Sequence, residues 1–261
     1  MPSKGFKAIY IILLILFLVS IFQIKKLPNK SEINSNLYNE PIQTNTERKE
    51  FNFDYRDKSY NVIPVADYEL WGLVASVNNI NAWYNYYHDK NTVNLKDICV
   101  IWGENINNEI YLDPKTKIKN GEWTCYYSWW SNVPDKKIYS EQISNNHLLS
   151  ADEKIQDLIR DVNIGDQIHL KGALVDYAEK GTAWYRKTSV SRTDSNQNSR
   201  SGGACEVFYV DEINILTQNQ KIWHTIKLWS LRFIISLLLI NFILFLSSVF
   251  SKKSLFKIKG R

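Results

Sequence analysis

Residues 167–177, QIHLKGALVDY, form the stretch whose structure is easiest to read from the sequence. Apolar residues such as Leu170 and Leu174 alternate with other residues, which predicts a strand with one apolar face and His169 on the opposite face. Gly172 in the middle of the stretch indicates a bend or a bulge. The stretch therefore predicts a curved β-strand.

A helix is predicted just before this strand. Residues 150–153, SADE, have the pattern of a capping box in which Ser150 is the N-cap and Glu153 reaches back to it. Four apolar residues follow at helical spacing and form one stripe: Ile155, Leu158, Ile159 and Val162. Gly165 can end the helical region with a left-handed turn.

Other short runs of apolar and aromatic residues read as strands. They occur at residues 69–77, 97–102, 122–130, 183–190 and 204–216. Strands, one helix and then strands again predict a mainly β domain of the α+β class over residues 61–218.

Two of these stretches resemble strands of OB folds. One is the turn Gly165-Asp166 leading into residues 167–172, and the other is 69–77 with its central Gly72. The resemblance is to OB-fold-like small β-barrel domains in bacterial membrane-anchored proteins that have no assigned activity. It implies a small OB-like β-barrel with one inserted helix. Because OB folds bind oligonucleotides, oligosaccharides or proteins, it implies no single ligand.

Two uncharged apolar segments flank this domain, at residues 8–24 and 233–250. Each is long enough to cross a bilayer, so we expect a transmembrane anchor within residues 1–26 and a transmembrane helix with a basic tail within 219–261. A cleaved signal peptide is the alternative for the first segment, although no small-residue cleavage pattern follows it. Asn241 in the second segment can contact a backbone carbonyl, which we favour, or a neighbouring helix.

The charge distribution predicts the topology. The net charge is +5, yet residues 1–26 and 229–261 hold ten Lys and Arg and no Asp or Glu, so residues 27–228 carry −5. Basic residues favour the cytoplasmic side, which predicts a bacterial inner-membrane protein with both termini cytoplasmic and residues 27–228 extracytoplasmic. The expected partner of the two helices is the lipid bilayer, and an acidic domain argues against nucleic acid as a partner.

Residues 27–60 are predicted to be a polar linker. They are rich in Asn, Glu, Lys, Ser and Thr and show almost no apolar periodicity. Such a segment buries too little apolar surface to offset its chain entropy.

Three cysteines, Cys99, Cys125 and Cys205, lie on predicted strands. In an oxidising compartment two of them can form a disulfide, and all three pairings remain open. The alternative is three buried cysteines that act as small apolar side chains. Their spacing matches no metal motif, and we expect neither a metal nor a cofactor.

A cysteine nucleophile would need a histidine base. His147, His169 and His88 are the candidates. The interpretation that we favour for His147 is a residue at the start of the predicted helix, near Ser150. For His169 we favour a solvated strand face.

Aromatic and basic residues supply the candidate binding sites. Successive side chains of the run 122–130 point to opposite faces of the strand. If one face fills the core, the other face places an aromatic stripe on the surface. A polar loop between the last two predicted strands carries two arginines that could bind an anion. The candidate binding residues are Trp123, Tyr126, Tyr127, Trp129, Trp130, Arg192 and Arg200.

Three functions fit these features. The first expectation is a protein-interaction or scaffold module of the cell envelope, with a membrane or periplasmic protein as partner. The second is an envelope glycan-binding or ligand-binding domain that uses exposed aromatic residues. The third is a thiol-dependent enzyme that uses one of the cysteines with His147. The absence of a catalytic motif favours the two functions without an enzymatic activity.

Overall fold

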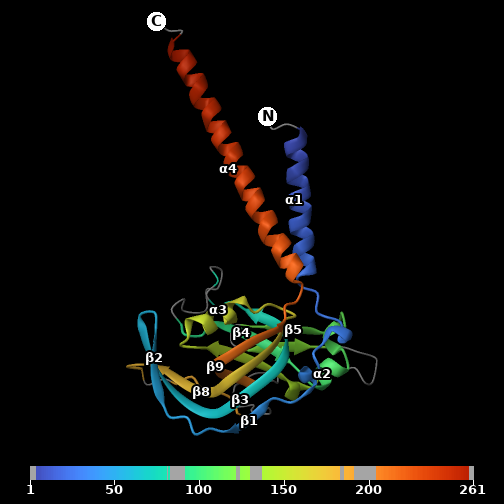
Figure 1. Cartoon of the computed structure of the whole chain (residues 1–261), viewed down its shortest axis with the longest axis vertical. Helices are drawn as coiled ribbons and strands as arrows, with labels where there is room; N and C mark the ends of the chain where they lie inside the picture. The colour runs from blue at the N-terminus through green and yellow to red at the C-terminus, as the bar shows by residue number, and fades with distance from the viewer. Residues whose placement is uncertain are drawn as a thin grey trace. The chain divides into compact units, whose positions relative to one another are not determined.

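The computed structural model of the chain describes residues 4–80, 82, 92–121, 124–129, 137–182, 185–190 and 204–258. It forms two compact units (Figure 1). One consists of Met1–Lys26 and Gln220–Arg261, and the other of Leu27–Asn219. The second unit holds a seven-stranded sheet and a separate two-stranded sheet.

The first unit contains two long apolar helices. Helix α1 spans Lys4–Gln23 and helix α4 spans Lys221–Ile258. Segments Gly5–Gln23 and Lys221–Ser248 are each long and apolar enough to cross a membrane, which confirms that two such helices flank the domain.

Asn241 joins the two helices. Its Nδ2 atom donates to the carbonyl oxygen of Leu237 at 2.9 Å and to the hydroxyl of Tyr10 at 3.0 Å. Both sequence-based interpretations of this residue therefore hold: the amide satisfies a backbone carbonyl of its own helix and contacts the neighbouring helix.

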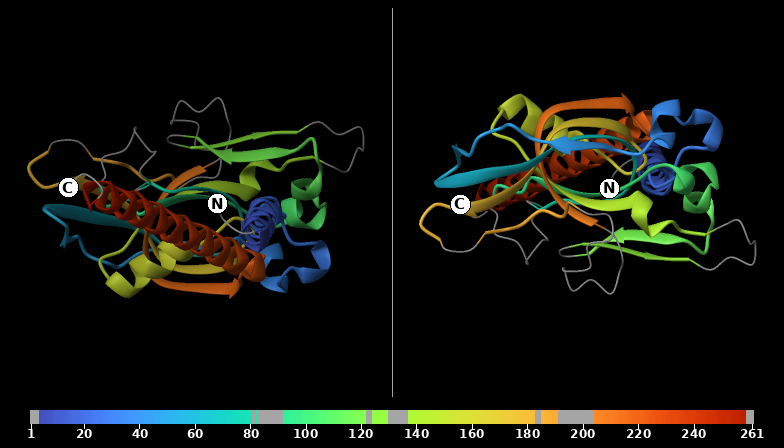
Figure 2. Two further views of the ribbon diagram at one scale, coloured as in Figure 1. Left: turned by 90° about the horizontal axis from the view of Figure 1, so that it is seen from above. Right: turned by 90° about the horizontal axis from the view of Figure 1, so that it is seen from below.

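Nine strands make up the sheets of the second unit. They are β1 Ile42–Asn45, β2 Phe51–Tyr55, β3 Lys58–Asn78, β4 Lys96–Ile101, β5 Lys117–Asn120, β6 Cys125–Ser128, β7 Ile143–Leu149, β8 Gln167–Glu179 and β9 Ala204–Thr217. The short helices are α2 Glu104–Asn107, η1 Lys30–Glu32, η2 Ser35–Tyr38, η3 Ile110–Leu112 and η4 Ser140–Gln142. Figure 2 shows the β5–β6 pair, in green, to one side of the larger sheet in both views.

The larger sheet has the order β1-β3-β4-β7-β9-β8, and its seventh strand, β2, pairs with β3. Strand β3 pairs with β8 as well as with β4. Strand β3 is long enough to do both, because its residues 60–73 pair with β8 and its residues 73–78 pair with β4. Bulges between Pro64 and Ala66 and between Val74 and Ser76 change its direction. Among the described strands only β7 and β9 pair in parallel.

Most strand predictions agree with the structure. The predicted curvature at Gly172 is confirmed, since the β8–β9 register shifts between Lys171 and Gly172. A Cβ atom at Gly172 would lie 2.1 Å from the carbonyl oxygen of Tyr209, so only glycine fits there. The prediction of a strand over 183–190 was wrong for its described part, where residues 185–190 contribute only a bridge between Tyr177 and Arg186.

The linker expected over residues 27–60 is instead part of the folded unit. It contains β1, β2 and two short helices, and Leu37 is fully buried. Its backbone groups form hydrogen bonds with the rest of the domain: the backbone N–H of Asn34 donates to Gln167 Oε1, and Gln167 Nε2 donates to the Glu32 carbonyl oxygen. The polar composition of residues 27–60 predicted that they bury too little apolar surface to fold. Hydrogen bonds to Gln167 and the buried side chain of Leu37 nevertheless hold the segment in place.

The predicted helix is α3, Glu153–Asp161, but its cap differs from the expectation. Asp152 is the N-cap, and its carboxylate accepts from the backbone N–H groups of Lys154 and Ile155. The Ser150 hydroxyl instead donates to the Val210 carbonyl oxygen at 2.9 Å. Gly165 has a φ of +82°, as its predicted turn requires.

Candidate functional site

Three neighbouring strands bring together a carboxylate, an imidazole and a thiol. Asp97 on β4 lies opposite His147 on β7 in the antiparallel register. Asn145, two residues before His147, lies opposite Cys205 on β9 in the parallel register. Because residues two apart on a strand share a face, these side chains lie on the same side of the sheet.

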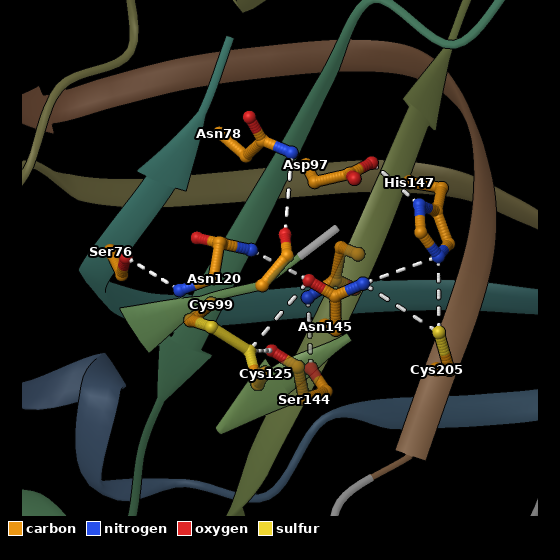
Figure 3. The surroundings of a disulfide bond; sticks show 12 residues. Ser76, Asn78, Asp97, Cys99, Asn120, Cys125, Ser144, Asn145, His147 and Cys205 are labelled. Carbon is orange, nitrogen blue, oxygen red and sulfur yellow. Dashed lines mark hydrogen bonds and ion pairs between the residues drawn. A yellow bond between two sulfur atoms is a disulfide. The ribbon is translucent and has the colours of Figure 1, made fainter. Parts of the chain in front are cut away.

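The three side chains form one chain of contacts (Figure 3). Asp97 Oδ1 lies 2.5 Å from His147 Nδ1, and His147 Nε2 lies 3.0 Å from Cys205 Sγ. Asp97 therefore fixes the ring orientation, with the Nδ1 proton toward the carboxylate and Nε2 toward the sulfur. A base oriented by a carboxylate and in contact with a thiol is the arrangement that activates a cysteine nucleophile.

The polar cluster is buried. Asp97 and His147 are each 1% exposed, and Cys205 is 5% exposed. The sequence-based interpretation of His147 as a residue at the start of a helix was wrong, because it lies inside β7 and faces the interior.

Burial and charge act on the pKa values in opposite directions. Burial is the largest single effect and lowers the pKa of His147, but the charges of Asp97 and Cys205 and the hydrogen bond with Asp97 together raise it to about 9. Burial likewise raises the pKa of Asp97, whereas the charge of His147 and hydrogen bonds from His147 and Asn94 bring it below its usual value. The carboxylate thus favours the protonated form of the imidazole.

The thiol of Cys205 responds to this imidazolium. Burial raises its pKa, but the charge of His147 and hydrogen bonds from His147 and Asn145 outweigh burial and lower the pKa below the usual value. The positive charge of Arg186 acts in the same direction. A thiolate is the nucleophilic form of cysteine.

Arg186 brings a further positive charge to the cluster. Its backbone is held against β8 by two hydrogen bonds with Tyr177, and its Nη2 atom lies 2.6 Å from His147 Nε2. The guanidinium has only donors, and its charge lowers the pKa of His147, so Arg186 opposes the protonation of His147 that Asp97 and Cys205 favour.

A disulfide joins Cys99 on β4 to Cys125 on β6, with a Cα–Cα distance of 5.8 Å. Of the two alternatives for the cysteines, the structure has the disulfide, and Cys205 is the cysteine outside the bond. The bond attaches the β5–β6 pair to the face of the sheet that carries the cluster (Figure 3).

The structure describes three of the candidate binding residues, Tyr126, Tyr127 and Trp129. Tyr126 and Trp129 are exposed by 52% and 43%, whereas Tyr127 packs partly against a buried cluster of the core. Trp123, Trp130, Arg192 and Arg200, and also His88, lie outside the described residues.

His169 lies in a separate polar contact. It stacks on Trp71 with ring centroids 4.4 Å apart, and its Nε2 atom lies 2.8 Å from Glu69 Oε1. It is thus partly covered, and not on a fully solvated face as expected.

Within the described residues, no group of three or more His, Cys, Asp or Glu side chains is arranged to hold a metal ion.

Sequence reasoning proposed Cys205 with His147 as one of several cysteine and histidine pairs, but it missed Asp97, Asn145 and Arg186. Asp97 reads as the polar start of an apolar strand, and no fixed spacing connects it to His147. One signal was present: four polar residues in a row, 144–147, between apolar neighbours.

Comparisons of the chain with protein-family models, with curated proteins and with solved structures found no match.

Proposed function

We propose that the protein is a membrane-anchored thiol-dependent enzyme of the acyl-transfer class. The contact chain from Asp97 through His147 to Cys205 carries the proposal. Cys205 is the nucleophile, His147 is the acid and base, and Asp97 orients and charges the imidazole.

The reaction begins when the Cys205 thiolate attacks the carbonyl carbon of an ester, thioester or amide. The S–C bond forms while the carbonyl electron pair moves to oxygen, where Arg186 can neutralise the developing charge. The intermediate then expels its leaving group, which takes the proton from His147 Nε2. Water or an amine attacks the resulting thioester and returns a proton to His147, which restores the starting state.

Access to the thiol is a requirement of this proposal. Cys205 is only 5% exposed, so a substrate reaches it when the part of the chain that covers it moves. Opening of a covered site during the reaction cycle is common in enzymes and also excludes water from the intermediate.

A chromogenic acyl donor tests the proposal. The full-length protein, solubilised in detergent without reductant, is mixed with p-nitrophenyl acetate. We expect a burst of p-nitrophenolate and an acetyl group on Cys205 in the intact mass. Cys205→Ser should abolish both, and His147→Asn should slow the burst strongly. A burst that is the same in all three proteins would contradict the assignment.

We further propose that the domain is an OB-like closed β-barrel. Strands β3, β4, β7, β9 and β8 each pair with two others of this group, and α3 lies between β7 and β8 in the chain. This pairing order supports a five-stranded barrel with one inserted helix.

The proposed location is the bacterial inner membrane, with both termini cytoplasmic and residues 27–228 outside the cytoplasm. Two observations support it. The excess of Lys and Arg lies beside the apolar segments, and the Cys99–Cys125 disulfide suits an oxidising compartment.

A second candidate function is binding of an envelope protein or glycan through the exposed rings of Tyr126 and Trp129. Exposed aromatic side chains are frequent at protein and sugar contacts. Crosslinking in cells with wild type and a Tyr126→Ala/Trp129→Ala variant tests the protein partner, and tryptophan fluorescence titrated with cell-wall fragments tests the glycan. Identical crosslinks and a flat titration would exclude this surface.

A further inference from the structure

Asn145 lies at the centre of the polar cluster and connects it to the β5–β6 pair. It is fully buried on β7. In the strand registers it lies opposite Cys99 of the disulfide on one side and opposite Cys205 on the other. Its side chain is therefore between the structural disulfide and the reactive thiol (Figure 3).

The two ends of the Asn145 amide face different partners. Its Nδ2 atom lies 3.6 Å from Cys205 Sγ and 3.2 Å from His147 Nε2. Nδ2 is only a donor, so its two protons can reach the sulfur and, when Nε2 is unprotonated, the imidazole. Hydrogen bonds to the charged form of a group favour that form.

The other end of the amide is held by the β5–β6 pair. Asn145 Oδ1 accepts from Asn120 Nδ2 at 2.8 Å. The backbone N–H of Asn120 donates in turn to Ser76 Oγ on β3 at 2.9 Å. Asn120 thus fixes which end of the Asn145 amide points at the thiol.

The disulfide keeps this arrangement in place. It fixes β6 to β4, and Asn120 on β5 is the register partner of Cys125 on β6. Cys125 Sγ also lies 3.7 Å from Asn145 Oδ1. A sulfur in a disulfide has no proton to donate, so Cys125 is not a hydrogen-bond donor to Oδ1, whereas Asn120 is.

We propose that Asn145 holds the Cys205 thiolate by hydrogen bonding and that Asn120 is the positioning residue that orients Asn145. The inference rests on the proposed function, because it assigns roles around the same nucleophile. It adds a group that stabilises the thiolate without carrying a charge, and it gives the β5–β6 pair a part in the reaction.

Other charged and titratable groups near the thiol must be separated from this effect. They are His147, Asp97 and Arg186, with Tyr177 beside Arg186. Substitution of Asn145 or Asn120 leaves all four in place, so a change in the pH profile reports the contacts that the Asn145 amide makes with Cys205 and His147.

The test measures the rate of iodoacetamide alkylation of Cys205 between pH 5 and 10 in the full-length, non-reduced protein in detergent. We expect Asn145→Ala to move the midpoint of the profile to higher pH and to lower the rate at pH 7 about tenfold, the effect of losing one hydrogen bond to a charged group. Asn120→Ala should move the midpoint in the same direction by less.

Asn146→Ala is the matched control. Asn146 is a buried neighbour on the same strand but on the opposite face, where it donates to Ser144 Oγ. It should lower the melting temperature without moving the midpoint. A variant that only disturbs packing would keep the wild-type midpoint, as this control should. If Asn145→Ala and Asn120→Ala both keep it, the inference is overturned.

The outcomes distinguish the two proposals. If wild-type Cys205 reacts only after unfolding, the proposed function fails. If wild type reacts in the folded state and both amide variants keep its midpoint, only the roles of Asn145 and Asn120 fail. If Asn145→Ala does not fold, Asn120→Ala decides, because Asn120 is less buried and its loss leaves Asn145 in place.

Discussion

Replacement of Asp97 by Asn should convert Cys205 from a reactive to a slow thiol near neutral pH. The substitution keeps the size of the side chain and leaves an oxygen that can accept from His147 Nδ1, which is 2.5 Å from Asp97 Oδ1 in the native protein. It removes the charge that raises the pKa of His147. The variant therefore tests the electrostatic role of Asp97 with little change in shape.

The expected magnitude follows from the pKa of His147. With a pKa of about 9, nearly all of the imidazole is protonated at pH 7.5. At the ordinary value of 6.5 only about a tenth is protonated, and burial lowers that fraction further. The fraction of Cys205 that faces an imidazolium falls by the same factor as the protonated fraction of His147. The alkylation rate of Cys205 at pH 7.5 should therefore fall by at least about tenfold.

The same substitution should change the pH dependence of stability. Because the pKa of His147 is raised in the folded state, its contribution to stability is complete below pH 6.5 and is lost as the pH rises through about 9. Because Cys205 also raises this pKa, Asp97→Asn should cost at most about 3 kcal/mol near pH 6 and progressively less toward pH 9. Melting temperatures measured across this range report the difference.

Iodoacetamide labelling followed by intact mass is the assay, and Asp166→Asn is the matched control. Asp166 is another buried carboxylate, but it accepts from the backbone N–H groups of Asn163 and Asn219, outside the thiol cluster. The control should lose stability and keep the alkylation profile. If Asp97→Asn labels at the wild-type rate with the wild-type midpoint, the imidazolium does not activate the thiol.

Three further predictions concern the disulfide, the contact between helices α1 and α4, and the N-cap of α3. A Cys99→Ala/Cys125→Ala variant should lose about 3–4 kcal/mol in urea unfolding, because a bond across a sequence separation of 26 restricts the unfolded chain; an unchanged midpoint would argue against the bond. Asn241→Leu and Tyr10→Phe should each weaken the helix pair by about 1 kcal/mol, and their double variant by less than the sum, in thermal unfolding in micelles. Asp152→Ala should cost about 1 kcal/mol through loss of the α3 cap, measured in the same way.

Periodic segments of the sequence predicted their structures well. The strand over 167–177 corresponds to β8, and the stripe of apolar residues after Asp152 corresponds to α3. The local pattern predicts the type of each element, but not every buried position: Leu158 of the predicted stripe is 40% exposed, whereas Gln156 is buried. The apolar segments 8–24 and 233–250 are helical, as predicted.

Strand β7 could not be predicted from periodicity. Its sequence, ISNNHLL, holds four polar residues that are all buried. Side chain to side chain bonds satisfy several of them, such as Asn146 to Ser144 and Asn145 to Asn120. A hydropathy pattern assigns such residues to a loop, because it does not include the hydrogen bonds that polar side chains form with other strands.

The candidate site depends on strand order, which the sequence does not show. His147 and Cys205 are 58 residues apart, and His147 and Asp97 are 50 residues apart. They meet because β4 and β9 are the two neighbours of β7. Cys205 and His147 could be named as candidates by residue type, whereas Asp97 and Asn145 required the register.

The most direct test of a reactive thiol is alkylation of the folded, non-reduced protein at pH 7 with iodoacetamide. Cys99 and Cys125 are bonded to each other, so a single label identifies Cys205, and Cys205→Ser is the control. We predict one label on wild type before unfolding and none on the control. Labelling of wild type that begins only after denaturation would contradict the account.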